Sequence, residues 1–171
     1  MFLLSTQALM DIICENPDVT AWIRPVPAQD IHASVVSVAH VQAEILSTPI
    51  EEGREVMELA LRALVSFARR NNALELFDEG AGAVFSRIAQ LNLRIDDDED
   101  LGDMSRMVVA TAIDRNLVLI EEAQPYHGQI DGLRVKDPYD GFRLARGSTR
   151  STERWLAHLH RRRLLSVKVR Q

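Results

Sequence analysis

Polar residues follow two predicted strands and begin two predicted helices, and at these positions the chain could do chemistry. The apolar run MFLL ends in Ser5-Thr6-Gln7, and the run LVLI ends in Glu121-Glu122-Ala123. His40 stands at the start of one helical pattern, and Asp103 and Ser105 stand at the start of another. Ligands of parallel α/β proteins bind at the carboxyl ends of the strands. We therefore expect these residues to face one common site.

Two kinds of chemistry fit these residue types. Ser5 and His40 could form a hydrolytic pair of nucleophile and base, although nothing places an orienting acid or an oxyanion hole around them. His40 and Glu44 share a helix face at spacing i, i+4, and with Asp103 they could hold a transition metal such as Mn²⁺ or Zn²⁺. The simpler interpretation makes Asp103 the N-cap of its helix and the two glutamates after LVLI surface acids.

Predicted strands and helices alternate along the chain. The strands are expected over residues 1–4, 31–38, 74–77, 117–120 and 133–135. The helices are expected over residues 8–14, 39–46, 51–70, 79–91 and 104–115, with a further short helix around Trp22 and Ile23. This order predicts an α/β fold with a central parallel sheet of four to five strands, flanked by helices on both faces.

The ends and faces of these helices can also be predicted. Asp18 is expected to cap the short helix, and Asp78 the helix that follows residues 74–77. In the helix of residues 51–70, one face is expected to be buried. That face consists of Val56, Leu59, Ala60, Ala63, Leu64 and Phe67.

Length and composition describe an ordinary globular chain. At 171 residues, 46% hydrophobic and 26% charged, it has room for one domain with a core. Cys14 is the only cysteine, which excludes an intramolecular disulfide and a Cys-based zinc site, and we expect its thiol to be buried. No apolar run is long enough to span a membrane and MFLL is too short for a signal peptide, so we expect a cytoplasmic protein without membrane contact.

The charge divides the chain into two parts. Residues 1–140 carry 11 Lys+Arg against 24 Asp+Glu, a net charge of −13, whereas residues 141–171 carry 9 against 1, a net charge of +8. We therefore predict a domain over residues 1–140 and a basic C-terminal tail over residues 141–171. The run DDDED at 96–100 is expected to be a solvated loop.

The basic tail has three interpretations. Ser151 or Thr152 could cap a helix through Leu165 with Trp155 and Leu159 among its apolar residues. Such a segment could dock on the acidic domain, bind nucleic acid or another acidic partner, or be a largely disordered extension. A basic cluster suited to phosphates or acidic groups follows within it, at Arg161, Arg162 and Arg163.

Several segments, in order, resemble the PIN-domain family and within it the VapC/FitB-type toxins of toxin–antitoxin pairs. They are MFLLSTQALMDII, the stretch from NPDVTAW to HVQAEI, LELFDEG, MVVATAIDRNLVLI and VKDPY. The resemblance covers residues 1–140 and implies a PIN-like fold. Members are generally ribonucleases that hold Mg²⁺ or Mn²⁺ with three or four carboxylates, because hard cations take oxygen ligands and then activate water.

This chain lacks those carboxylates at the matching positions. The resemblance places the family's acids at Ser5, His40, Ser105 and Ala123. It therefore implies a degenerate catalytic site, with no metal cofactor expected. Acids that could act as displaced ligands are Asp103, Glu121, Glu122 and Glu44.

Three functions follow from the resemblance. The first is a non-catalytic binding or regulatory module that acts through protein or RNA partners. The second is an active Mg²⁺- or Mn²⁺-dependent endoribonuclease of a toxin–antitoxin system with displaced ligands. The third is a subunit that pairs with an active paralogue. The resemblance also implies an antitoxin-like protein partner and a homodimer, and the basic tail adds RNA as a candidate partner.

Overall fold

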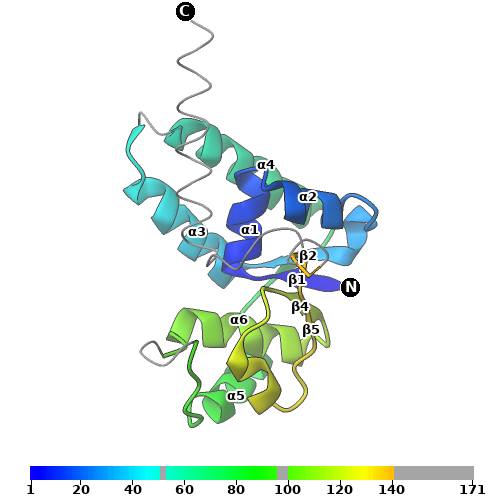
Figure 1. The fold of residues 1–171 in the computed structure, drawn as a ribbon, viewed down its shortest axis with the longest axis vertical. Helices are drawn as coiled ribbons and strands as arrows, with labels where there is room; N and C mark the ends of the chain where they lie inside the picture. The colour runs from blue at the N-terminus through cyan, green and yellow to red at the C-terminus, as the bar shows by residue number, and fades with distance from the viewer. Residues whose placement is uncertain (51–52, 96–99, 141–171) are drawn as a thin grey trace, which may run out of the picture.

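Five parallel strands form the centre of the molecule (Figure 1). The computed structural model describes residues 1–50, 53–95 and 100–140. Its strands lie in the order β3-β2-β1-β4-β5. They are β1 (Phe2–Leu4), β2 (Ile31–Ser34), β3 (Leu74–Glu75), β4 (Val118–Ile120) and β5 (Val135–Lys136). The predicted α/β fold with a parallel sheet is confirmed.

Helices cover both faces of this sheet (Figure 1). On one face lie α1 (Thr6–Ile13), α2 (Pro17–Ile23), α3 (Val35–Ser47) and α4 (Arg54–Arg70). On the other lie α5 (Glu79–Ile88), α6 (Asp103–Asp114) and the 3₁₀ helix η3 (Pro125–Gln129). A second 3₁₀ helix, η1 (Ala28–Asp30), precedes β2.

Two hydrophobic cores lie on opposite sides of the sheet, and the central strand contributes to both. Leu3 packs with α5 and α6, whereas Leu4 packs with α1, α3 and α4. Leu119 and Ile120 of β4 divide in the same way. Successive side chains of a strand point to opposite faces, so these short strands are buried on both sides. Apolar runs without alternation, such as MFLL and LVLI, are typical of such strands.

The predicted strand of residues 31–38 is too long, because helix α3 already begins at Val35. The Ser34 hydroxyl accepts a hydrogen bond from the Val36 backbone amide at 3.1 Å and caps the helix. This cap places the β-branched residues that follow in a helix, against their preference for strands. His40 therefore lies in the second turn of α3 rather than near its start.

Predicted helix ends also differ from the structure at α2 and α5. Asn16, not Asp18, caps α2, because its side-chain oxygen accepts a hydrogen bond from the Asp18 backbone amide at 3.0 Å. Asp78 caps α5 as predicted, accepting from the Ala81 amide at 3.3 Å. Helix α5 ends at Ile88 rather than at residue 91.

Helix α4 is correctly predicted, but the face assigned to its core is only partly right: Ala60 and Leu64 pack against the core, whereas other residues of that face do not. Val56, Leu59 and Phe67 are 69%, 67% and 39% exposed. The buried residues of α4 are Met57, Leu61 and Ala68. Because α4 has apolar residues on two faces, periodicity could not decide which face meets the sheet.

Some of the remaining predictions concern residues that the structure describes, and others do not. Cys14 is buried as expected, with 8% exposure. Among the described residues, no helix has the length and hydrophobicity needed to cross a membrane. The proposed tail helix, its arginine cluster and residues 96–99 of the acidic run lie outside the described residues.

Candidate functional site

Ser5 lies directly after β1 and is almost fully buried, with 3% exposure. Its backbone amide donates to the Ile120 carbonyl of β4 at 3.1 Å, so the chain is held against the neighbouring strand. Its hydroxyl accepts a hydrogen bond from the Ala8 amide at 3.2 Å and caps α1. The side chain therefore has a structural role in the first turn of α1.

His40 and Glu44 interact on α3 as their spacing predicts. The His40 Nε2 atom lies 3.4 Å from the Glu44 Oε1 atom, and their side chains are 36% and 45% exposed. Partial burial raises the pKa of Glu44 above its usual value, and the nearby His40 offsets only part of this rise. The His40 Nδ1 atom is enclosed and has no hydrogen-bond partner among the described residues. Within those residues no hydrogen bond joins Ser5 and His40, so the hydrolytic pair is not formed.

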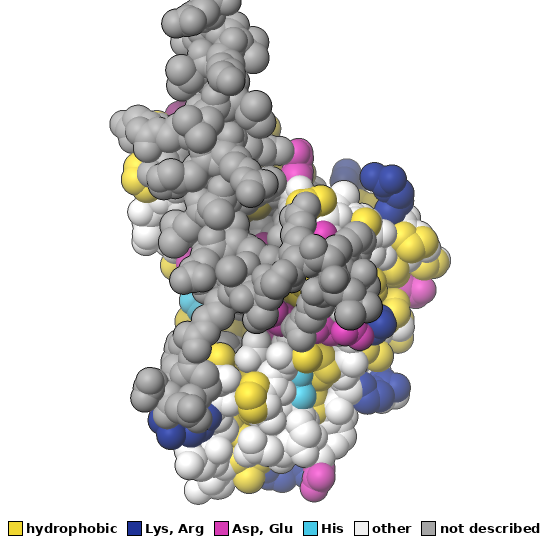
Figure 2. Space-filling view, in the orientation of Figure 1, with side chains coloured by type: hydrophobic (Ala, Val, Ile, Leu, Met, Phe, Trp, Pro, Cys, Tyr) yellow, Lys and Arg dark blue, Asp and Glu magenta, His cyan; other side chains and the backbone are white. Residues whose placement is uncertain are grey.

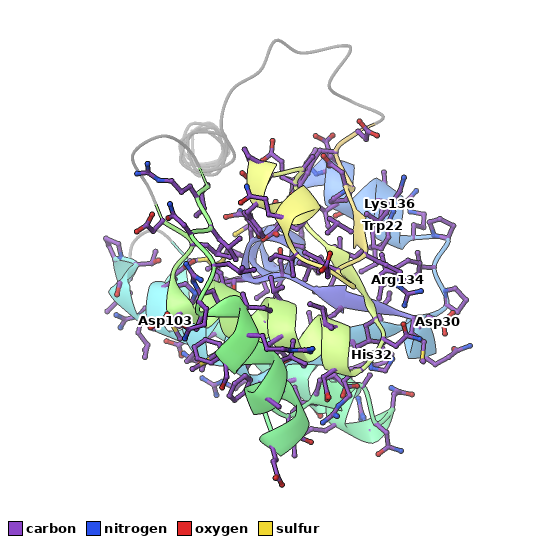
Figure 3. The ribbon with its side chains drawn as sticks, turned by 90° about the horizontal axis from the view of Figure 1, so that it is seen from below. Trp22, Asp30, His32, Asp103, Arg134 and Lys136 are labelled. Atoms are coloured by element: carbon purple, nitrogen blue, oxygen red, sulfur yellow. The ribbon has the colours of Figure 1, made fainter. Side chains whose placement is uncertain are left out.

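Ser105 and Asp103 lie in the first turn of α6, at the carboxyl end of the sheet. Figure 3 shows Asp103 on the opposite side of the molecule from Asp30 and Arg134, which directly precede β2 and β5. Asp103 is exposed, and Gly102 is the N-cap of α6, so the predicted Asp103 cap is wrong. Helix α6 has no side-chain cap.

A buried arginine beside Ser105 was not predicted. Arg106 is only 8% exposed and donates three hydrogen bonds to backbone carbonyls. They run to the oxygens of Leu101, Ile88 and Leu91 at 2.7, 2.9 and 3.0 Å. Arg106 thus satisfies the carbonyls at the end of α5 and ties α5 to α6. A lone arginine in MSRMVVA gives no signal of this role in the sequence.

Glu121, a candidate displaced ligand, is held by the loop that follows it. Its Oε2 atom accepts hydrogen bonds from Tyr126 Oη and from His127 Nε2, the latter at 2.8 Å. The His127 Nδ1 atom accepts from the Gln124 amide at 3.1 Å, so Nε2 carries the proton. Burial and the Glu121 charge raise the pKa of Tyr126 far above its usual value.

The two residues after Glu121 complete this edge of the sheet. The exposed Ala123 contributes only its backbone, whose amide donates to Asp137 Oδ2 at 2.9 Å. Glu122 is partly exposed, and its charge, with that of Asp137, contributes to raising the pKa of Tyr139. In Figure 2 acidic side chains gather near the middle of the face shown, whereas Lys and Arg lie toward its edges.

A second buried carboxylate, Asp11, was also missed. It is 3% exposed in α1, where Oδ1 accepts from Gln7 Nε2 at 3.1 Å and Oδ2 accepts from Tyr139 Oη. Tyr139 is 2% exposed, and burial followed by the Asp11 charge raises its pKa far above the usual value. This contact fastens the segment after β5 to α1. An acid inside the apolar run ALMDII was the only signal in the sequence.

The donor atoms at the four family positions do not fit a hard divalent cation. Ser5 and Ser105 offer hydroxyls, His40 a ring nitrogen and Ala123 no side-chain donor. Mg²⁺ and Mn²⁺ sites need carboxylate oxygens. In the described part of the chain, no group of three or more His, Cys, Asp and Glu side chains is arranged to hold a metal ion.

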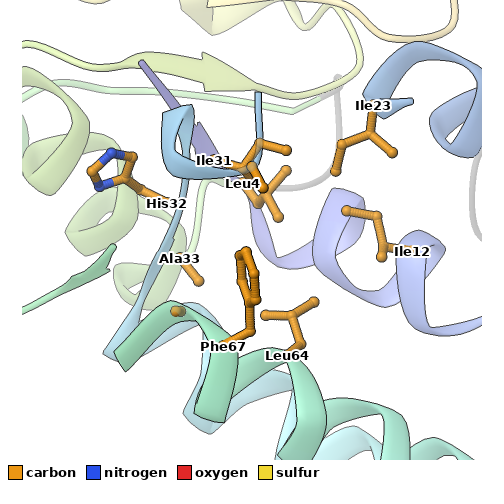
Figure 4. Close-up of a pocket in the computed structure, with 10 residues that line it drawn as sticks. Leu4, Ile12, Ile23, Ile31, His32, Ala33, Leu64 and Phe67 are labelled. Carbon is orange, nitrogen blue, oxygen red and sulfur yellow. The ribbon is translucent and has the colours of Figure 1, made fainter. Parts of the chain in front are cut away.

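Two hollows lie away from these residues. An apolar pocket of about 140 Å³ lies between α1, α2, β2 and α4, where its lining includes Ile12, Ile23 and Phe67 (Figure 4). A groove of about 410 Å³ runs between α3 and α4, with Val38 and Leu61 in it and arginines among its lining residues. None of the predicted site residues lines either hollow.

Comparisons with known proteins give matches by structure alone. No protein-family model matches the chain, and no curated protein matches it. Among solved structures, FitAcB from Neisseria gonorrhoeae matches with a TM-score of 0.66 at 18% identity, over 81% of this chain and 99% of that chain. A toxin–antitoxin complex from Klebsiella pneumoniae matches with a TM-score of 0.60 at 17% identity, over 81% and 98%.

A third match is VapBC2 from Rickettsia felis bound to a DNA fragment from their promoter. Its TM-score is 0.59 at 17% identity, over 79% of this chain and 96% of that chain. All three matches span nearly the whole of the matched chain and about four-fifths of this chain. The fold of this chain is therefore the VapC/FitB-type PIN-like fold.

Proposed function

We propose that this protein is a non-catalytic PIN-like module that acts by binding a partner. The observation that carries this proposal is the donor set at the family's acidic positions, which offers two hydroxyls and one imidazole but no carboxylate. Metal-dependent hydrolysis of RNA needs an ion to activate water and to neutralise developing charge. A site that cannot hold the ion cannot supply these effects.

The surrounding contacts support the same proposal. The Ser5 hydroxyl serves as the N-cap of α1. Glu121 is engaged by Tyr126 and His127 on one carboxylate oxygen, so it would have to leave this loop to reach a metal. Asp103 is exposed at the start of α6. Of the candidate displaced ligands, Glu121 is therefore committed to another contact, and Asp103 is exposed to solvent.

The proposed partner is a small antitoxin-like protein. The Klebsiella pneumoniae structure that shares this fold is a toxin–antitoxin complex. A fold shared at this level can keep its binding surfaces after its chemistry is lost, because the core does not depend on the acids. We include a homodimer in this proposal, and RNA as the second class of partner through the basic tail.

Incubation of the purified full chain with single-stranded RNA and Mg²⁺ or Mn²⁺ tests the proposal. We expect no cleavage above that of an Asp103→Ala variant. The matched control is Asp131→Ala, which removes another exposed acid that is not among the predicted site residues. Metal-dependent cleavage that is lost in Asp103→Ala but kept in Asp131→Ala would overturn the proposal and establish the displaced-ligand ribonuclease.

Calorimetric titration with Mn²⁺ gives a second readout that does not depend on the choice of RNA. We expect no binding tighter than about millimolar, because the family positions lack oxygen anions. A tighter site that Glu121→Gln abolishes would contradict the proposed loss of metal binding.

A further inference from the structure

The outward face of α4 is apolar, although it points away from the core. Val56, Leu59, Ala63 and Phe67 follow one another at spacings of three, four and four residues, so they share one side of the helix. All four are exposed, and Val56 and Leu59 are more than two-thirds exposed. A helix with apolar residues on opposite faces is typical of helices that are covered on both sides.

The apolar pocket opens next to this face. Leu64, Phe67 and Ala68 of α4 form one wall of it, and Ile12 of α1 and Ile23 of α2 face them (Figure 4). Phe67 belongs both to the exposed face and to the pocket wall. The outward face and the pocket therefore form one continuous apolar surface.

We propose that residues 151–165 of the same chain cover this surface. The first reason is that the connecting residues are long enough for the segment to reach this surface. The last described residues are fastened to α1, because Tyr139 bonds to Asp11. Helix α1 in turn packs beside α4, where Cys14, just after α1, contacts Met57 through their sulfur atoms at 4.0 Å. Ten residues, 141–150, separate that point from the segment. They can span roughly 33 Å, more than the length of about 26 Å of a 17-residue helix such as α4.

The second reason is the pattern of apolar residues in the segment. Trp155 and Leu159 are four residues apart, as Ala63 and Phe67 of α4 are. If the segment is helical and runs antiparallel to α4, Trp155 lies against Phe67 while Leu159 lies against Ala63. Residues four apart share a helix face, so both contacts can form at once.

The third reason is charge. The segment belongs to a tail of net charge +8, and the rest of the chain has a net charge of −13. In the antiparallel arrangement Glu153, the only acid of the tail, approaches Arg69 and Arg70 at the end of α4. The cluster at 161–163 and the basic residues after it approach the beginning of α4, where Glu55 is exposed and Glu58 already pairs with Arg54 and Arg62. Opposite charges therefore meet between Glu153 and the arginines at the end of α4, and between the cluster and Glu55 at its beginning.

Because the segment belongs to the same chain, a modest affinity for this surface is sufficient to keep it docked. A short connection gives the segment an effective concentration in the millimolar range at its own docking surface. A separate partner would have to displace the segment before it could bind this face. The inference does not rest on the proposed loss of catalysis.

Tryptophan fluorescence of the full chain tests the inference. The chain has two tryptophans, Trp22 and Trp155, so Trp22→Phe leaves Trp155 as the single reporter. We expect Trp155 in this background to show blue-shifted emission and protection from acrylamide. Leu59→Asp should cause a red shift and loss of that protection.

The matched control is Leu91→Asp, which introduces the same charge at a leucine that is 40% exposed just after α5, in the layer across the sheet from α4. This variant should leave Trp155 emission unchanged. Trp155 emission that is already red-shifted, or that does not respond to Leu59→Asp, overturns the inference. Sedimentation adds a further decisive outcome: a dimer that Leu59→Asp dissociates without moving Trp155 emission would show that a second copy covers the face.

Discussion

Ser5 occupies the position at which the PIN-domain resemblance places the first metal-binding aspartate, and its hydroxyl caps α1 instead. The resemblance places two further acids of the family at His40 and Ser105, where this chain again has no carboxylate. Carboxylates held close together repel one another when no metal is bound, and this repulsion raises their pKa values and lowers stability. If the protein holds no ion, as we propose, replacing all of these acids relieves that repulsion.

Introducing acids at these three positions should produce both the repulsion between carboxylates and a stabilisation of the fold by bound metal. We expect the combined variant Ser5→Asp, His40→Glu and Ser105→Asp to melt at a lower temperature than the parent chain in EDTA. Added Mn²⁺ should then stabilise it, by about 2.7 kcal/mol at a hundredfold excess over the dissociation constant. Thermal melts with and without Mn²⁺ measure this.

The parent chain is the control for that experiment, and its melting temperature should not respond to Mn²⁺. A parent chain stabilised as strongly as the triple variant would show that a metal site already exists. An unresponsive triple variant would show that these three positions do not converge on one site.

Among the elements, α5 depends on contacts at both of its ends. Asp78 caps its beginning and also pairs with Arg115, which reaches Glu75 Oε2 at 3.3 Å. At its other end Arg106 donates to the Ile88 carbonyl. Free carbonyls at the end of a buried helix are costly, so Arg106 stabilises the packing of α5 on α6. These contacts hold the layer that carries Ser105.

The contribution of Asp78 should depend on pH. The hydrogen bond from Arg115, followed by that from the Ala81 amide, lowers the pKa of Asp78 below its usual value of 3.8. A carboxylate with a lowered pKa stabilises the fold fully above its unfolded pKa, and this stabilisation is lost as the pH falls through the folded pKa. Asp78→Ala should therefore lower the urea midpoint at neutral pH, and the difference should shrink at about pH 2.

Asp78→Asn separates the two roles of this residue. Asparagine keeps the N-cap but lacks the charge, so its midpoint at neutral pH should fall between those of the parent and Asp78→Ala. An equal loss at neutral and acidic pH in Asp78→Ala would contradict an ionic contribution.

In the whole molecule, the segment after β5 closes the chain back onto its first helix. Asp11 and Tyr139 are 128 residues apart in sequence, and their side chains meet in a buried contact. Gln7 completes the hydrogen bonding of the Asp11 carboxylate. The ends of the described domain therefore stabilise each other, and the last described residues are fastened to α1.

Loss of this contact should destabilise the whole domain. Tyr139→Phe removes a donor from a buried carboxylate, and we expect a loss of about 1.5–3 kcal/mol in the free energy of unfolding. Tyr126→Phe is the matched comparison, because it removes a phenol from Glu121, which is 18% exposed and keeps its contact with His127. Tyr126→Phe should lose less free energy of unfolding than Tyr139→Phe. Urea unfolding measures both, and a larger loss in Tyr126→Phe would contradict a special role for the Asp11 contact.

Much of the fold could be predicted from local patterns. The buried strands MFLL and LVLI, the Asp78 cap and the alternation of strands and helices each depend on residues close together in sequence. The resemblance to the PIN-domain family also depends on ordered local segments, and the VapC/FitB-type PIN-like fold confirms it. The same local patterns failed at the end of β2, because the Ser34 cap outweighed the strand preference of the valines after it.

The sequence by itself determined the parallel α/β fold and the single buried cysteine, since each is a matter of residue type and local order. The loss of acids that the resemblance implies also depends on residue type alone and stays a prediction. Only the tertiary structure decided which face of α4 meets the core, and it alone revealed the buried roles of Arg106 and Asp11. Their partners lie 18 and 128 residues away in sequence. Contacts over such separations depend on how the layers pack, and no local pattern encodes that packing.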